Sequence, residues 1–480
     1  MIAMAQNRND HSPSVSPDHH FSHDRPVAID LFAGAGGLSL GLEQAGFDVV
    51  AAVDHDPIHC AVHAYNFPMS NEICAEIAKV TVAAAQESIR AGLRSFGRHQ
   101  EWDGEVDLVA GGPPCQGFSA IGRHYAKDER NDLVFEFHRL VTGLRARYFL
   151  MENVPGMLAG GHKTAILKAL IMRFQRSGYR IVDPQRILNA ASFGVPQDRR
   201  RLFILGARSD MPLPEYPHPI VAPRAINPAR ERKRGSAMGL MPLGPSVADA
   251  IGDLPDADEF ETLLESDSVR LAPEVASMRR DKASPYAARL AGLSTDDTDL
   301  SYPRVWDDLL LTSSRRTVHQ QASIERFRVA EPGRKEEATR LYRLAADGVS
   351  NTIRAGTAQD HGSFTSARPI HPTLARVLTV REAARLHSYP DWFRFHGTKW
   401  HGFRQVGNSV PPLLAQAVAA QIVAALGLRP GRPGTVIELG SADLLWMGND
   451  AAARHFDQLR HAFRSERSLE TDAGETAAAS

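Results

Sequence analysis

Short apolar segments alternate with helical stretches between residues 27 and 205, and no other feature of the sequence constrains the fold as strongly. Each apolar segment is long enough for one buried strand, and each helical stretch can return the chain to the start of the next strand. This alternation predicts an α/β fold with a doubly wound, mostly parallel sheet that binds ligands at the carboxyl ends of its strands. The predicted strands are residues 27–32, 48–53, 106–110, 148–151, 180–188 and 202–205. The predicted helices are residues 38–45, a helix ending near 66, 132–144 and 163–176.

The alternation stops after about residue 212, where the sequence is rich in Pro, Arg and Asp and has weak periodicity. Regular segments return only at residues 379–386 and 413–426. This interruption predicts a second, smaller and irregular domain inserted before the last elements of the first. The predicted divisions are a disordered lead-in (1–24), the first part of the main domain (25–255), the inserted domain (256–375), the return to the main domain (376–428) and a C-terminal tail (429–480). We expect this tail to be weakly ordered, with one amphipathic helix at about residues 449–463.

Composition excludes several classes of protein. The 480 residues carry a net charge of −1, which neither requires nor excludes a nucleic-acid partner. No apolar run approaches the roughly 20 residues of a membrane-spanning helix, so we expect no membrane association. Three cysteines are too few for a disulfide framework in a chain of this length, which indicates the reducing cytoplasm. We predict no metal site.

A glycine-rich turn follows the first predicted strand, with the sequence Asp30-Leu31-Phe32-Ala33-Gly34-Ala35-Gly36-Gly37. Glycines allow the backbone to approach a ligand, and the start of the next helix offers free N–H groups. Sites for NAD, FAD and S-adenosylmethionine all use such turns, and a simple packing turn is the alternative. Asp54 ends the next strand, where a carboxylate can accept hydrogen bonds from a ribose.

Cys115 lies in an unusually stiff segment directly after the strand 106–110, with the sequence Gly111-Gly112-Pro113-Pro114-Cys115-Gln116-Gly117. Two prolines fix the backbone before the sulfur, which suits a nucleophile held at a strand end. Cys60 and Cys74 lie on or near predicted helices, and we predict that they are small buried hydrophobic residues.

Three charged side chains lie at the ends of two other predicted strands. Glu152 comes directly after the strand 148–151, so its carboxylate is expected to face the same cleft as Cys115. Arg199 and Arg201 precede the last strand, and in an extended segment both project to one side. Surface ion pairs are the alternative explanation for these three residues.

The order of these segments resembles the cytosine-5 DNA methyltransferases of bacterial restriction–modification systems, over about residues 26–425. The resemblance implies a Rossmann-like, S-adenosylmethionine-dependent methyltransferase fold, with the irregular insert in the place of that family's target-recognition domain. The motifs that carry it are the glycine-rich turn, Pro-Pro-Cys-Gln, Glu-Asn-Val, Gln-Asp-Arg-Arg-Arg, Arg-Val-Leu-Thr-Val-Arg-Glu-Ala-Ala-Arg-Leu and, at the start of the last helix, Gly-Asn-Ser-Val-Pro-Pro.

The resemblance implies a DNA (cytosine-5-)-methyltransferase that moves a methyl group from S-adenosyl-L-methionine to C5 of a cytosine in double-stranded DNA. The Cys115 thiolate would add to C6, C5 would then attack the methyl group, and loss of the C5 proton would release the cysteine. Glu152 would contact N3 and the exocyclic amine, and Arg199 and Arg201 would lie near O2 and the thiolate. Because C6 is buried in a stacked duplex, the base must be flipped out.

Contacts to the cofactor also follow from the resemblance. The family usually has Glu where this chain has Asp54, so the shorter acid must reach further to the ribose. Glu76 is the nearest candidate for the acid on the adenine side, and residues 117–131 resemble a loop that closes over the flipped base. The implied cofactor-binding residues are Phe32, Ala33, Gly34, Gly36, Gly37, Asp54, His55, Asn408, Ser409 and Val410.

A tRNA cytosine-5 methyltransferase is the alternative, because one branch of the family modifies RNA. The insert of more than a hundred residues and the absence of a Cys-Phe-Thr segment argue against that branch. Within the insert, Arg354, Gln359 and His361 could read base edges or could be ordinary turn residues. The implied role is protection of host DNA, with a cognate restriction endonuclease or other defence proteins as partners.

Overall fold

The computed structural model describes residues 25–98, 102–114, 133–158, 161–228, 241–356 and 368–459. The predicted disordered lead-in, residues 1–24, lies outside these ranges. So do Cys115, the loop 117–131, and Gln359 and His361 of the insert.

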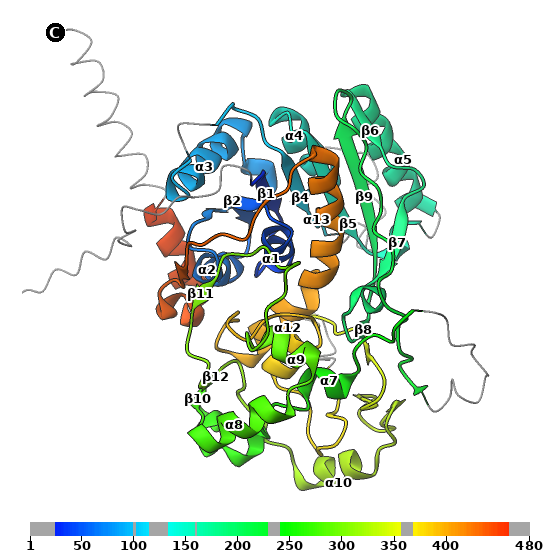
Figure 1. Cartoon of the computed structure of the whole chain (residues 1–480), viewed down its shortest axis with the longest axis vertical. Coiled ribbons are helices and arrows are strands. Elements are labelled where there is room, and N and C mark those ends of the chain that lie inside the picture. The colour runs from blue at the N-terminus through cyan, green and yellow to red at the C-terminus, as the bar shows by residue number, and fades with distance from the viewer. Residues whose placement is uncertain are drawn as a thin grey trace, which may run out of the picture.

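The central sheet has eight strands in the order β3-β2-β1-β4-β5-β9-β6, with β7 also paired to β9 (Figure 1). Strands β1 to β5 run parallel to one another, whereas β9 runs antiparallel to β5, β6 and β7. The strand order reverses between β1 and β4, which is the switch point where doubly wound sheets bind ligands. The predicted fold class is therefore confirmed. The strands are β1 (Val27–Leu31), β2 (Asp48–Asp54), β3 (Asn71–Cys74), β4 (Leu108–Gly111), β5 (Tyr148–Asn153), β6 (Tyr179–Ile181), β7 (Arg186–Asn189) and β9 (Arg200–Arg208).

Helices cover both faces of the sheet because consecutive strand residues point to opposite sides. In β5, Phe149 and Met151 pack with α3, α4 and α5, whereas Tyr148 and Leu150 pack on the other face with α1 and α13. Figure 1 shows α13 crossing that second face. Each large side chain buried in these layers contributes about 1.5–3 kcal/mol. The helices are α1 (Gly37–Gln44), α2 (Pro57–Asn66), α3 (Val82–Ser95), α4 (Leu133–Gly143), α5 (Gly161–Arg176) and α13 (Pro412–Leu426).

Two differences from the predicted elements have simple causes. Residues 180–188, predicted as one strand, form β6 and β7, which both pair with β9. Strand β3 and helix α3 were not predicted. Strand β3 is the edge strand and only half-buried, so the polar sequence Asn-Glu-Ile-Cys lacks the apolar run of a central strand.

The insert consists of short elements around small hydrophobic clusters, as its weak periodicity predicted. One cluster contains Leu263, Leu271 and Leu311, and another contains only Phe327, Ile370 and Val377. The short elements before the insert are β8 (Gln197–Asp198) and α7 (Val247–Ile251). Those of the insert and of the return to the main domain are β10 (Val269–Arg270), α8 (Pro273–Lys282), α9 (Pro285–Leu290), β11 (Arg304–Val305), β12 (Leu310–Leu311), α10 (Gln321–Val329), β13 (Arg334–Lys335), β14 (Tyr342–Arg343), β15 (Ser350–Asn351), α11 (Val380–Arg385) and α12 (Lys399–Asn408).

One segment of the insert, residues 299–306, packs on the main domain, and we call it the strap. The Tyr302 hydroxyl donates to Asp48 (2.8 Å), and Arg304 donates to both carboxylate oxygens of Glu43 (2.9 and 2.8 Å). All four side chains are buried. The strap lies inside the range predicted as a separate domain, yet it is fixed to α1 and β2.

The C-terminal segment contains the predicted helix, at residues 449–459, but is otherwise better ordered than predicted. Residues 429–459 are not a weakly ordered tail: β16 (Ile437–Glu438) pairs with β11 of the strap, and Leu445 and Phe456 pack with Cys60 and Val62 of α2. Figure 1 shows these last elements beside α2. The apolar partner that stabilises them lies far away in the sequence, so local composition gave no sign of it.

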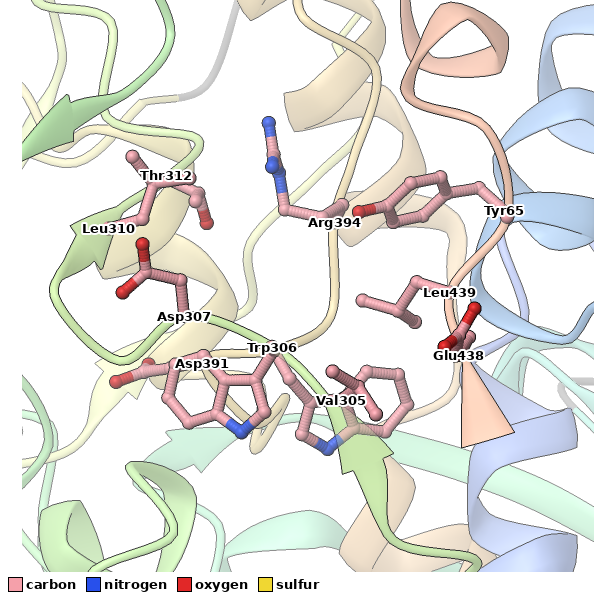
Figure 2. Close-up of a pocket in the computed structure, with 12 residues that line it drawn as sticks. Tyr65, Val305, Trp306, Asp307, Leu310, Thr312, Asp391, Arg394, Glu438 and Leu439 are labelled. Carbon is pink, nitrogen blue, oxygen red and sulfur yellow. The ribbon is translucent and has the colours of Figure 1, made fainter. Parts of the chain in front are cut away.

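A cavity of about 320 Å³ lies between the strap, β16 and α2 (Figure 2). The Tyr65 hydroxyl points toward Arg394 in this view. Two carboxylates of its wall, Asp307 and Asp391, form ion pairs with arginines. These charges are compensated within the protein, and this cavity shares no lining residue with the site described next.

One helical stretch within the described ranges, Lys399–Leu426, is long and apolar enough to cross a membrane. It comprises α12 and α13, and 61% of its most apolar 18-residue segment is buried inside the protein. Its apolar residues belong to the hydrophobic core, because α13 packs along α1 on one face of the sheet.

Candidate active site

The glycine-rich turn between β1 and α1 has glycines with different roles. Gly34 and Gly36 have left-handed backbones, with φ of 58° and 100°. A β-carbon at Gly36 would lie 2.4 Å from the Phe67 ring, and one at Gly37 would lie 2.6 Å from the Val410 carbonyl oxygen. Packing therefore requires these two glycines. Gly34 has no described atom within 4 Å of that position, so of these three glycines Gly34 turns an open face toward a ligand.

Asp54, at the end of β2, is held as an ionised acceptor. Its Oδ2 accepts the Gly34 N–H (2.9 Å) and its Oδ1 accepts the Asp56 N–H (2.8 Å). The Nδ1 atoms of His55 and His59 lie 3.4 and 3.7 Å from Oδ1. Burial alone would raise the pKa of Asp54, but the hydrogen bonds from the two histidines hold that pKa well below its usual range. A lone pair on Oδ2 stays available for a donor from a ligand.

A cavity of about 510 Å³ opens beside this turn. Its size is typical of small-molecule sites, which span about 300–1,000 Å³. Three predicted cofactor-binding residues line it (Phe32, Asp54 and His55), and so does Glu76. Pro114 of the predicted Pro-Pro-Cys segment lines it as well. The sequence did not indicate the remaining lining residues, most of which are apolar and carry no signature: Val53, Ala75, Ile77, Ala78, Leu133 and Glu136.

The predicted contacts at Asn408, Ser409 and Val410 form the turn between α12 and α13. This turn packs against Gly37, so the structure brings it to the glycine-rich turn across a long stretch of sequence. None of the three residues lines the 510 Å³ cavity, and neither do Ala33, Gly34, Gly36 or Gly37. Within the described ranges, no cluster of His, Cys, Asp and Glu could hold a metal ion.

Glu152 lies over the segment that leads to Cys115. A β-carbon at Gly112 would lie 3.0 Å from a Glu152 carboxylate oxygen, and Asn153 Nδ2 donates to the Pro113 carbonyl (3.0 Å). The end of β5 therefore supports the Pro-Pro segment through a hydrogen bond and a close contact. Pro114, the last described residue before Cys115, lines the 510 Å³ cavity.

Glu152 forms an ion pair with Arg201, whose Nε lies 2.7 Å from Oε1. The antiparallel register of β5 and β9 brings the two together, since Glu152 pairs with Phe203 and Asn153 with Leu202. Burial raises the pKa of Glu152, and the charges of Arg201 and Arg199 oppose that rise only in part. A carboxyl with a raised pKa can hold a proton that it shares with a substrate.

Arg199 has a different environment from Arg201. It is 1% exposed, and its guanidinium donates to the carbonyl oxygens of Ile353 (3.0 Å), Gly407 (2.9 Å) and Ser409 (2.7 Å). Burial lowers the pKa of Arg199 to about 9. The geometry makes Arg199 a positioning residue that joins the insert to the turn after α12, and leaves Arg201 as the arginine beside Glu152.

Gln197 and His387 support the same junction, and the sequence gave no reason to single out His387. Gln197 Nε2 lies 2.9 Å from His387 Nδ1, and its Oε1 accepts the Ile353 N–H (3.0 Å). His387 Nε2 lies 3.1 Å from the Ser409 carbonyl oxygen. Burial holds the pKa of His387 well below its usual value, so the ring is neutral. Nε2 then carries the proton toward Ser409, and Nδ1 accepts from Gln197.

Comparison with known proteins agrees with this geometry. The family model for C-5 cytosine-specific DNA methylases matches residues 27–424. The chain belongs to this family. Type II methyltransferase M.XorII of Xanthomonas oryzae pv. oryzae is 50% identical over 430 residues, covering 89% of this chain and 92% of that protein. Type II methyltransferase M.AgeI of Thalassovita gelatinovora is 31% identical, covering 83% of this chain and 99% of that protein.

A solved structure supports the same relationship. The crystal structure of a prophage-encoded E. coli protein, described as a DNA modification methyltransferase, matches with a TM-score of 0.60 and 29% identity, covering 84% of this chain and 99% of that one. This chain is thus a DNA (cytosine-5-)-methyltransferase, which acts on DNA and needs a methyl donor. The predicted family is confirmed, and the alternative of a tRNA substrate is not supported.

Proposed function

We propose that this DNA methylase takes its methyl group from S-adenosyl-L-methionine and delivers it to C5 of a flipped cytosine in one short duplex sequence. The observation that carries the proposal is the Glu152–Arg201 ion pair, which lies beside Gly112 at the start of the Cys115 segment. Pro114 of that segment also lines the 510 Å³ cavity. A carboxyl, an arginine and the segment of the nucleophile thus meet next to a space for a cofactor.

The residues of that cavity fit S-adenosylmethionine. Asp54 is ionised and keeps a free lone pair, which suits a ribose hydroxyl. Phe32 offers a ring for the adenine, and Glu76 a carboxylate for its amino group. Gly34, Gly36, Gly37 and Ala33 would shape the turn, and Asn408, Ser409 and Val410 would close the other side. When bound, the cofactor supplies a methyl carbon made electrophilic by a positively charged sulfur.

The protein's own groups then activate the cytosine. We assign Cys115 as the nucleophile that adds to C6, which makes C5 electron-rich. Glu152, whose pKa is raised by burial, would hold a proton at N3 and so withdraw electrons from the ring. Arg201 would fix Glu152 and face O2 of the base, while Arg199 would hold the surrounding backbone in place. Loss of the C5 proton finally lets the sulfur leave.

We place the enzyme in the cytoplasm, in a restriction–modification or phage-defence system, where it would protect host DNA from a cognate endonuclease. The names of its relatives, two type II methyltransferases, support that role. We assign target recognition to the insert, residues 256–375, because its small clusters and short strands leave many side chains free of the core.

Two experiments test this proposal. Expression in a host without cytosine methylation, followed by bisulfite sequencing, should reveal 5-methylcytosine at one recurring word and none with Cys115→Ala. A duplex with 5-fluorocytosine at that word should form an adduct that survives denaturation, because fluorine cannot leave as the proton does. Unmodified DNA despite intact soluble protein would refute the DNA assignment. Methylation without a Cys115-dependent adduct would refute the covalent route alone.

A further inference from the structure

Four cations lie on α12 and on the insert segments beside it: Arg315 and Arg368 lie close enough to Lys399 to lower its pKa, and Arg404 follows Lys399 by five residues on α12. Within the described ranges, none of them is within ion-pair distance of a carboxylate, and the hydrogen bonds of Arg315 and Lys399 go to backbone or hydroxyl oxygens. The buried arginines nearby behave differently. Arg279 and Arg385, for example, both pair with aspartates. We call the four unpaired residues the cation row.

Lys399 begins α12 and is fixed in place by the insert. Its Nζ donates to the Arg316 carbonyl (2.8 Å) and to Thr317 Oγ1 (3.1 Å), which leaves one N–H for a ligand. Burial and the positive charges of Arg368 and Arg315 lower the pKa of Lys399 to about 8. Cations that repel one another at such a site are stabilised only when an anion comes between them.

Aromatic rings of α12 orient the two other arginines of the row. The guanidinium of Arg368 lies over Phe403, 4.6 Å from the ring centre, and that of Arg404 lies over Trp400 at 5.3 Å. Stacking holds each planar group by its face and leaves its N–H edge available for hydrogen bonds, the arrangement that suits phosphate. The Nε of each arginine is buried with no hydrogen-bond partner among the described atoms.

The row leads toward the active site. Helix α12 starts at Lys399 and ends at Asn408, in the turn that packs on Gly37, so the row begins about 14 Å along the helix from that turn. Arg404 lies close enough to His55, in the cofactor cavity, to oppose its protonation. Pro114, the last described residue before Cys115, lines the same cavity as His55.

We propose that the cation row binds the phosphates of the DNA strand that carries the target cytosine. This inference rests on the proposed function and adds the place where the backbone is held. Phosphate contacts fix the register of the duplex without reading its sequence. Loss of one such contact should therefore weaken binding to every duplex equally and lower its salt dependence.

The test uses the full chain and two fluorescent duplexes of equal length, one with the methylated word and one scrambled. Affinities are measured by anisotropy over a range of NaCl concentrations. For Lys399→Gln and for Arg404→Gln we expect the slope of log affinity against log salt to fall by about 0.9 each, on both duplexes. Lys399→Arg should keep the wild-type slope. Lys168→Gln, an exposed lysine on α5, is the matched control and should also keep it.

Cofactor affinity, measured by calorimetry, shows whether each variant is folded. Wild-type slopes in both Gln variants with cofactor binding intact would overturn the proposal. A loss of affinity confined to the methylated word would overturn it too, because the row would then read bases. Neither result touches the proposed function, which fails only if the wild-type enzyme leaves DNA unmethylated.

Discussion

Replacing either of two arginines that lie two residues apart should have a different effect. One variant should lose stability and cofactor affinity, and the other should lose turnover. Arg199 donates to three buried carbonyl oxygens, whereas Arg201 pairs with Glu152 beside the predicted nucleophile segment. We compare Arg199→Met with Arg201→Met, because methionine fills similar space and removes every donor. Arg200→Met serves as the control, since Arg200 is exposed and its ion pair with Asp198 is long, at 3.6 Å.

The magnitudes follow from the contacts. Arg199→Met leaves the Ile353 and Gly407 carbonyls without a donor, at about 1–3 kcal/mol each, whereas the Ser409 carbonyl keeps the His387 N–H. Relief of the desolvated guanidinium offsets part of this cost, so we expect a net loss of about 2–4 kcal/mol. Two of the carbonyls belong to the turn predicted to hold the cofactor. If about 1.4 kcal/mol of the loss falls on that turn, the Kd for S-adenosylmethionine rises about tenfold.

Arg201→Met should spare the fold and damage the chemistry. Its side chain is 14% exposed, and the raised pKa of Glu152 lets that carboxyl take up a proton once the arginine is gone, so we expect a stability loss of about 1–2 kcal/mol. Removal of one preorganised charge at a reacting group typically lowers kcat by about 10²–10³-fold. We therefore expect a large fall in the single-turnover rate with an unchanged Kd for the cofactor.

Three assays separate the two roles: denaturant unfolding, calorimetric titration with S-adenosylmethionine, and single-turnover methylation of the mapped word. The reasoning fails if Arg199→Met keeps wild-type stability and cofactor affinity but loses turnover as Arg201→Met does. Arg199 would then act on the base, and its carbonyl contacts would be incidental. The Arg200→Met control should match the wild type in all three assays.

Two further predictions concern buried charges away from the reacting groups. Burial raises the pKa of Asp30 to about 7, so the stability that its neutral form contributes is complete below about pH 4 and is lost as pH rises to about 7; Asp30→Asn should flatten the fall in thermal stability between pH 4 and 7, and an unchanged slope would contradict this. Arg304→Met leaves Glu43 buried and unpaired, which should cost about 3–5 kcal/mol of unfolding free energy; the double variant with Glu43→Met should recover most of that loss, and a double variant as unstable as the single one would exclude the ion pair as the cause.

The sequence predicted those parts of the fold and site that depend on local pattern. Apolar runs marked β1, β2, β4, β5 and β9, and parallel strands must end at a common edge, so the motifs after them were expected to meet. The half-buried edge strand β3 was not predicted, because its polar residues are typical of a loop. The cavity wall at Ile77 and Leu133 was not predicted either, because in the sequence an apolar residue beside a ligand cannot be told from any core residue.

Arg199 illustrates a second limit. Alternation along an extended segment correctly placed Arg199 and Arg201 on one side, and both charges do act on Glu152. What separates them is the set of acceptors around Arg199, which comes from residues 353, 407 and 409. No pattern within the Gln-Asp-Arg-Arg-Arg motif could indicate partners more than 150 residues away, so the division of labour appears only in three dimensions.

The strap changes how the insert should be understood. Arg304 holds Glu43 near the carboxyl end of α1, and the amino end of the same eight-residue helix begins in the glycine-rich turn at Gly37. The base of the insert and the predicted cofactor turn are therefore joined through about 12 Å of one rigid helix. An insert anchored in this way cannot rotate freely at residue 256. The end of the insert is fixed too, because Leu344 and Ile353 pack in the large cluster around α11 and Arg199 holds the Ile353 carbonyl. Movement that admits DNA is therefore expected in residues 314–341, beside the small cluster of Phe327, Ile370 and Val377.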